Sequence, residues 1–149
     1  MDERRVEKDT QPVMLELSDG SQLAGEFFLR RFEAHHEGRQ KVGDLLNDSL
    51  AFIPFNTGEG VVLLNVSELV SIRVPLETEA DDLMRLGQKY AVRFRMKQGT
   101  DLEGEIYVNL PMESSRIKDY LNQPVRFFAL FRPDAVVYLN RRFILTVMD

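Results

Sequence analysis

The chain contains no cysteine among its 149 residues, and only two histidines, His35 and His36. Without cysteine there is no disulfide framework, no thiolate nucleophile and no cysteine-bearing zinc site. The two histidines are adjacent, and neighbouring residues of an extended chain point in opposite directions, so we expect no metal site there. A Gly-rich phosphate loop and a Gly-x-Ser-x-Gly elbow are also missing. The sequence therefore predicts a protein that is not an enzyme and that needs no cofactor.

Long apolar runs are absent as well. The stretch 60–64 is far shorter than the ~20 residues that a membrane-spanning helix needs. The first residues are charged and have no apolar segment behind them, so we expect no signal peptide. We therefore expect no membrane span and a cytoplasmic location.

Positive charge is scarce overall, and it is unevenly distributed. The formal net charge is -5, which argues against a protein that coats nucleic acid. Residues 1–75 hold 8 Lys and Arg against 13 Asp and Glu, whereas residues 91–149 hold 9 against 7. The two halves thus have opposite signs, which favours head-to-tail association of one copy with the next; the alternative is that the two complementary faces pair within one chain.

The chain does contain an internal repeat. Shifted by 79 positions, residues 13–27 align with residues 92–106, and both glycines of each stretch coincide. After a loop that is four residues longer in the first copy the shift becomes 75, and Asp-Leu-Leu-Asn at 44–47 meets Asp-Tyr-Leu-Asn at 119–122. The chain is therefore predicted to be a tandem duplication of a unit of about 60 residues.

Each unit has the pattern of a small β structure. Apolar residues alternate with polar ones at the start of each unit, and a glycine follows where a hairpin must turn. The predicted strands cover 13–17, 22–29, 50–55, 61–65 and 69–74 in the first unit, and 92–96, 101–108, 125–130, 135–139 and 143–148 in the second. We expect an all-β fold of two tandem five-stranded SH3-like barrels.

The remaining segments complete the predicted organisation. Residues 1–11 are expected to be a mobile charged arm, 12–75 the first barrel, 76–90 an acidic linker with a short helix capped by Thr78, and 91–149 the second barrel. A second short helix at 116–121 is expected to begin at Ser115 and to end at Asn122 in the left-handed conformation.

The strand and turn pattern resembles that of Sm-like proteins. The run from Val13 to Phe27, with two glycines separated by four residues, is similar to the first hairpin of that family, and residues 64–74 and 139–147 resemble its last two strands. A helix at 79–86 also fits this layout. The whole unit also looks like an uncharacterised bacterial domain family whose loop ends in Asp-x-Leu-Asn. The resemblance implies small β-barrels and RNA as a possible ligand, although Asn65-Val66 and Asn140-Arg141 replace the family's Arg-Gly pair.

Two functions follow as expectations. The first is a protein-interaction or scaffold module that binds another protein and a second copy of itself; its candidate contact residues are Phe28, Phe127, Asn47 and Asn122, the two asparagines serving either as helix caps or as ligand contacts. The alternative is an RNA-binding regulator. Its candidate residues form the basic face of the second unit: Arg93, Arg95, Lys97, Arg141 and Arg142.

Overall fold

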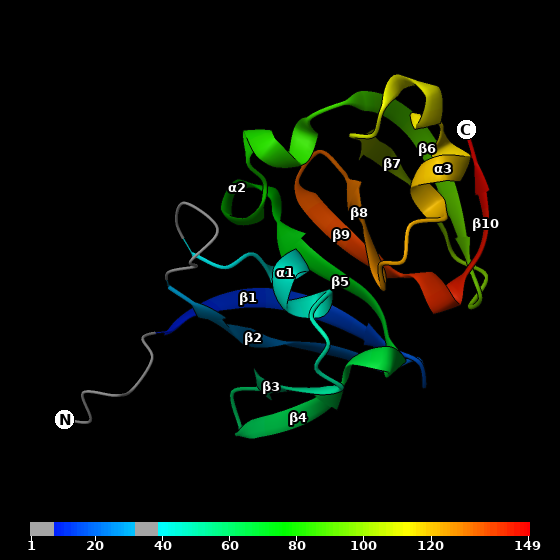
Figure 1. Ribbon diagram of the computed structural model, residues 1–149. Coiled ribbons are helices and arrows are strands. Elements are labelled where there is room, and N and C mark those ends of the chain that lie inside the picture. The colour runs from blue at the N-terminus through cyan, green and yellow to red at the C-terminus, as the bar shows by residue number, and fades with distance from the viewer. Residues whose placement is uncertain (1–7, 32–38) are drawn as a thin grey trace.

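The computed structural model describes residues 8–31 and 39–149, and its main feature is one antiparallel sheet of ten strands (Figure 1). The strands are β1 (Lys8–Leu17), β2 (Gln22–Arg30), β3 (Phe52–Asn56), β4 (Val61–Asn65), β5 (Leu69–Pro75), β6 (Gln88–Met96), β7 (Asp101–Val108), β8 (Phe127–Phe131), β9 (Ala135–Asn140) and β10 (Ile144–Met148). The prediction of a predominantly β chain is confirmed. The sheet is not closed, and β10 and β4 are its two free edges.

The sheet repeats one strand order twice. The first half of the chain has the order β5-β1-β2-β3-β4, and the second half has the order β10-β6-β7-β8-β9. The two halves meet where β5 pairs with β9, in the middle of the molecule (Figure 1). The duplication read from the sequence is thus matched strand for strand within the described residues.

Glycines account for two constraints that both halves share. Gly20 and Gly99 both have a φ of 88° in the first turn of their half, the conformation that favours glycine there. At Gly25 a Cβ would lie 2.3 Å from the carbonyl oxygen of Asn56, and at Gly104 it would lie 2.6 Å from that of Phe131. Each half therefore needs glycine where its third strand crosses its second.

The repeated tetrapeptide forms a one-turn helix in each half, α1 (Val42–Leu46) and α3 (Ile117–Leu121). The Asp44 carboxylate accepts a hydrogen bond from the Lys41 backbone at 3.0 Å, and Asp119 caps the start of α3 in the same way. The predicted cap at Ser115 is therefore wrong, and so is the left-handed end, because Asn122 has a φ of -90°.

The linker and the arm also differ from the prediction. The linker holds two short pieces instead of one helix, α2 (Leu76–Glu79) and the 3-10 turn η2 (Asp82–Arg85). Asp81 rather than Thr78 caps the second piece, because its side chain accepts a hydrogen bond from the Met84 backbone at 3.0 Å. The predicted arm at 1–11 is wrong for its last four residues, which belong to β1; the rest of it lies outside the described residues.

The remaining 3-10 turns are η1 (Val66–Glu68), η3 (Met112–Ser114) and η4 (Arg141–Phe143). Two apolar cores lie on the sheet, one for each half of the chain. The first core is built around Phe27, Phe55 and Leu15, and the second around Phe94 and Ile106. Each core also includes residues from the other half of the chain, so the two halves are packed against each other.

Candidate functional site

The contact between the two halves is centred on β9. Residues 71–75 of β5 pair with residues 139–135 of β9, so β9 has neighbours on both edges. All six of its residues are buried. Val136 and Tyr138 pack into the first core, whereas Val137 packs into the second. β9 is therefore shared by both cores.

Aromatic residues of β8 extend this contact. Phe127 and Phe131 belong to the second half but pack into the first core, with exposed fractions of 2% and 6%. The structure therefore places Phe127, a predicted contact residue, between the halves. Phe28, its counterpart in that prediction, is half-buried on β2.

Polar side chains hold the same contact from the first half. Asn47 accepts a hydrogen bond from the Phe127 backbone N–H at 2.9 Å and donates its amide to the Phe127 carbonyl at 3.2 Å. From the second half, Asn140 donates to the carbonyls of Ser67 at 3.2 Å and Leu69 at 2.8 Å. The asparagine at the end of each repeated tetrapeptide was a predicted contact, and the first of them binds backbone across the contact.

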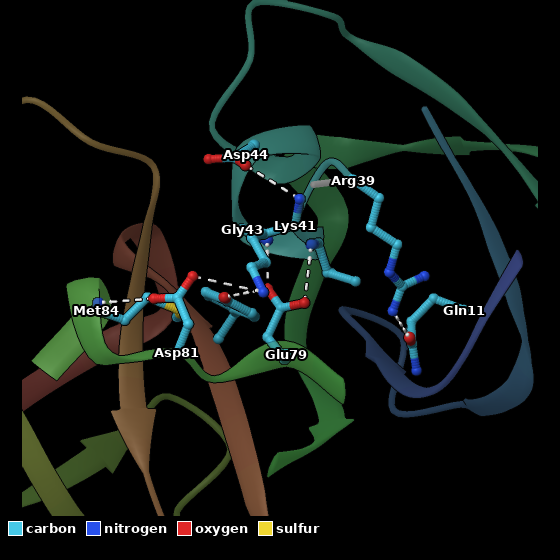
Figure 2. Close-up of polar contacts among 10 residues, drawn as sticks. Gln11, Arg39, Lys41, Gly43, Asp44, Glu79, Asp81 and Met84 are labelled. Carbon is cyan, nitrogen blue, oxygen red and sulfur yellow. Dashed lines mark hydrogen bonds and ion pairs between the residues drawn. The ribbon is translucent and has the colours of Figure 1, made fainter. Parts of the chain in front are cut away.

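Glu79 is the buried centre of a polar cluster that ties the linker to both halves (Figure 2). Its carboxylate accepts hydrogen bonds from the backbone N–H groups of Val42 and Gly43, both at 3.0 Å, and from the Tyr138 hydroxyl. Burial and the neighbouring Glu79 charge raise the pKa of Tyr138 well above its usual range. A Cβ at Gly43 would lie 2.7 Å from the Tyr138 hydroxyl oxygen, so glycine is required for this approach.

Sequence reasoning missed two residues of this contact. Glu79 lies among the acids of the linker, and no local signal distinguishes it from the exposed Glu77 or Asp82. Arg126 donates to the carbonyls of Leu46 and Leu50, at 3.2 and 2.9 Å, and to that of Asp48. Nothing in its sequence neighbourhood predicts that role.

The outer end of the first half exposes the positions that the second half buries. Under the shift of 75, Phe52 corresponds to Phe127 and Leu63 to Tyr138. Phe52 is 56% exposed and Leu63 is 68% exposed, and Val61 beside it is 60% exposed. The face of β3 and β4 is thus apolar and uncovered.

The outer end of the second half shows the same contrast. Leu145 and Met148 of β10 are 55% and 62% exposed. In the described chain Asn122 donates its side-chain amide to Lys118 of its own helix at 2.8 Å, and makes no contact like that of Asn47. The two asparagines predicted as contacts therefore have different surroundings.

The basic residues of β6 face acidic residues on β7. Arg93 forms an ion pair with Glu103 at 2.6 Å, and Arg95 lies opposite Asp101. Lys97 and its neighbour on η4, Arg142, both lie over the Phe143 ring.

The remaining predicted basic residue, Arg141, donates to the Gln123 carbonyl at 2.5 Å and lies over the Phe128 ring. Near it is a hollow of about 590 Å³ lined by Ser67, Pro124, Val125, Arg126, Asn140, Arg141 and Arg142. Thus the five candidate RNA-binding residues come from β6, the turn after it and η4, and Lys97 and Arg142 lie over the same ring.

The described residues give no sign of a metal site or of a membrane-spanning helix. No three acidic or histidine side chains of residues 8–31 and 39–149 are grouped so that they could hold a metal ion. His35 and His36 lie outside the described residues. Over the described ranges, no helix has the length and apolar character needed to cross a membrane.

Comparison with known proteins gives no relative: no family model, curated protein or solved structure matches the chain significantly. The contact between the two halves and the exposed ends of the sheet are therefore the basis for a function.

Proposed function

We propose that this protein is a non-enzymatic interaction module, a scaffold that binds an extended segment of another protein or of a second copy as an added strand on β4. The observation that carries the proposal is the contrast between two equivalent strands. All of β9 is buried, with β5 along its edge and the two cores on its faces, whereas Val61 and Leu63 of β4 are 60% and 68% exposed. A partner strand on β4 would cover those side chains as β5 covers β9.

The backbone of β4 supports strand addition. In the described sheet β4 pairs with β3 alone, so its outer edge presents a row of unpaired N–H and C=O groups. Natural edge strands are usually guarded by charged residues or proline, yet Val61–Asn65 contains neither. In strand addition the backbone provides affinity and the alternate side chains provide specificity, so the preferred segment has apolar residues at every second position.

The proposal includes the finer organisation of the chain. We regard residues 12–75 and 91–149 as two five-stranded SH3-like units of the Sm-like kind, joined by the acidic linker. The repeated strand order and the two cores support this division. In this view the face of β3 and β4 in the first unit is exposed, whereas the corresponding face of β8 and β9 in the second unit is buried between the units.

Affinity capture from native lysate followed by binding with purified components tests the proposal. Leu63→Lys places a charge on the exposed β4 face, and Leu83→Lys makes the same change at a leucine of the linker that is 74% exposed. We expect the wild type and Leu83→Lys to bind the recovered partner equally, and Leu63→Lys to bind it at least about tenfold more weakly. Repeated recovery of neither another protein nor a second copy of the chain, or equal binding by Leu63→Lys, would refute the proposal.

RNA binding is a second candidate, and the hollow lined by Arg126, Arg141 and Arg142 favours it. Contacts between arginine and phosphate make affinity fall steeply with salt concentration. We expect binding of mixed RNA at ~50 mM salt, where weak electrostatic contacts persist, and its loss when Arg141 and Arg142 are both replaced by alanine. No binding at that salt concentration would eliminate this candidate.

A further inference from the structure

We infer that the strand added to β4 is β10 of a second copy, so that the chains join head to tail. This inference rests on the proposed function above and names its partner. The starting point is the pairing of β5 with β9. Under the shift of 75, β5 corresponds to β10 and β9 corresponds to β4. Both of these counterparts are free edges, one at each end of the sheet.

The internal pairing fixes the register of the contact between copies. Ile72 lies opposite Tyr138 in the internal pair. Their counterparts are Val147 and Leu63, so Val147 of one copy should lie opposite Leu63 of the next. β4 keeps its own pairing with β3, so Val61 and Leu63 stay on one face of the sheet, and the internal pair alone gives the register.

Exposure differs systematically between the internal contact and its counterparts on the first half. Phe127, Val136 and Tyr138 are 2%, 0% and 3% exposed, and they fill the open side of the first core. Their counterparts, Phe52, Val61 and Leu63, are 56%, 60% and 68% exposed. The first half therefore carries an uncovered copy of this apolar face.

The complementary face is uncovered on the second half. Val70 of β5 is fully buried in the second core, whereas its counterpart on β10, Leu145, is 55% exposed. The same holds for the helices, because Leu46 of α1 is fully buried but Leu121 of α3 is only partly buried. Each end of the molecule thus exposes one half of the contact that the chain makes internally.

The polar contacts have counterparts too. Asn47 binds the backbone of Phe127, and the equivalent contact joins Asn122 of one copy to Phe52 of the next. Asn140 donates to carbonyls at the start of β5, and Asn65 is placed to do the same at the start of β10. The asparagine after each one-turn helix therefore has the same role in both halves. Asn47 binds β8 of its own chain, and Asn122 binds β3 of the next copy.

Charge agrees with this assembly. At the internal contact, Asp134 forms an ion pair with Arg73 at 2.9 Å, and Met14 lines the same groove. The counterpart of Arg73 is Met148, which cannot form this ion pair. The counterparts of Asp134 and Met14 are Glu59 and Arg93, however, so a carboxylate of one copy approaches an arginine of the next. Opposite charge increases the rate of encounter and fixes the partner more than it adds affinity.

Two further stabilising features of the internal contact have no counterpart. Tyr138 corresponds to Leu63, which has no hydroxyl for a buried carboxylate, and Arg126 corresponds to Ala51, which cannot bind carbonyls. The contact between copies is therefore weaker than the internal one and depends on protein concentration. Because it is heterologous, it closes into a ring or continues as a filament.

Disulfide crosslinking of two single-cysteine variants tests the register, and the absence of native cysteine removes any background. Leu63→Cys and Val147→Cys are mixed under mild oxidation, with one of them carrying a mass tag. Opposed residues of antiparallel strands have Cα atoms ~4.5–5.5 Å apart, within the range of a disulfide. We expect the mixed dimer as the main product, and little when Leu145→Cys replaces Val147→Cys, because that residue lies about 7 Å further along the strand.

Absence of the mixed dimer, or equal yields with Val147→Cys and Leu145→Cys, would overturn the inference. If a variant is misfolded by circular dichroism, Val61→Cys with Asp149→Cys tests the same register at two exposed positions. The proposed function fails separately: it survives a negative crosslink if a purified partner still binds the wild type and not Leu63→Lys. It fails together with the inference if neither a partner nor a second copy binds.

Discussion

Replacing Glu79 with glutamine tests the buried cluster that joins the linker to both halves. The carboxylate accepts hydrogen bonds from two backbone N–H groups of α1, at Val42 and Gly43, and from the Tyr138 hydroxyl. Glutamine has almost the same shape but turns one of the two oxygens into an N–H₂ donor. In either orientation of the amide, one backbone N–H of α1 faces another donor in a buried site.

The size of the effect follows from this mismatch. A buried donor left without an acceptor costs ~1–3 kcal/mol, and a hydrogen bond to a charged group is worth ~1.5–3 kcal/mol. The amide and one backbone N–H are both affected. The remaining oxygen keeps either the Val42 bond or the Gly43 and Tyr138 bonds, depending on the orientation of the amide. We therefore expect Glu79→Gln to lower the free energy of unfolding by about 2–4 kcal/mol.

Urea denaturation followed by circular dichroism measures this free energy. Glu77→Gln is the matched control, because Glu77 lies on the same short helix and is exposed, and such surface changes are usually within ~0.5 kcal/mol. A value for Glu79→Gln within about 0.5 kcal/mol of the wild type would show that the carboxylate does not hold α1, which would refute the reasoning.

Three further predictions use the same measurement. Asn47→Ala removes two hydrogen bonds to β8 and is expected to cost about 1–3 kcal/mol, whereas Asn122→Ala at low protein concentration should cost less than half as much; equal losses would contradict the asymmetry of the two halves. Gly104→Ala is expected to destabilise by more than about 1 kcal/mol, since its Cβ would lie 2.6 Å from a β8 carbonyl oxygen, and an unchanged midpoint would contradict the close approach. Burial raises the pKa of Tyr120 to about 12 and that of Tyr138 well above its usual range, so above pH ~10 the unfolded chain loses protons that the folded chain keeps. The free energy of unfolding should therefore fall from about pH 10 upward, by at most ~1.4 kcal/mol per pH unit for each tyrosine, with a shallower fall in Tyr120→Phe; an identical fall in that variant would contradict the assignment.

The sequence predicted the strands well because each of them is specified locally. Alternating apolar residues and glycines with required conformations lie within a few positions of one another, as at Gly20 and Gly99. The internal repeat adds support, because the same strand pattern occurs at equivalent positions in both halves. Helix ends were predicted less well, because serine, threonine and aspartate are all suitable caps, and only the backbone geometry decides between Ser115 and Asp119.

The surfaces could be predicted only in part, because a repeat shows which positions are equivalent but not which copy is covered. Phe52 and Phe127 have equivalent places in the alignment, yet one is exposed and the other buried. The difference arises from β5 pairing with β9, a contact between strands about 65 residues apart in the chain. The charges of β6 form a basic face in the sequence, but in the structure Glu103 lies beside Arg93 on the next strand. Contacts across strands of this kind leave no local pattern.

The mass of the chain in solution tests most directly whether its outer edges bind as its inner ones do. One chain has a mass of 17.2 kDa. Light scattering from ~2 to ~200 µM protein, at low and high salt, should give a mass that rises with concentration for the wild type and for Leu83→Lys, and that stays near one chain for Leu63→Lys. A mass of one chain for the wild type under every condition would contradict the account, because the surface repeated at the two ends would then join nothing but the two halves of a single molecule.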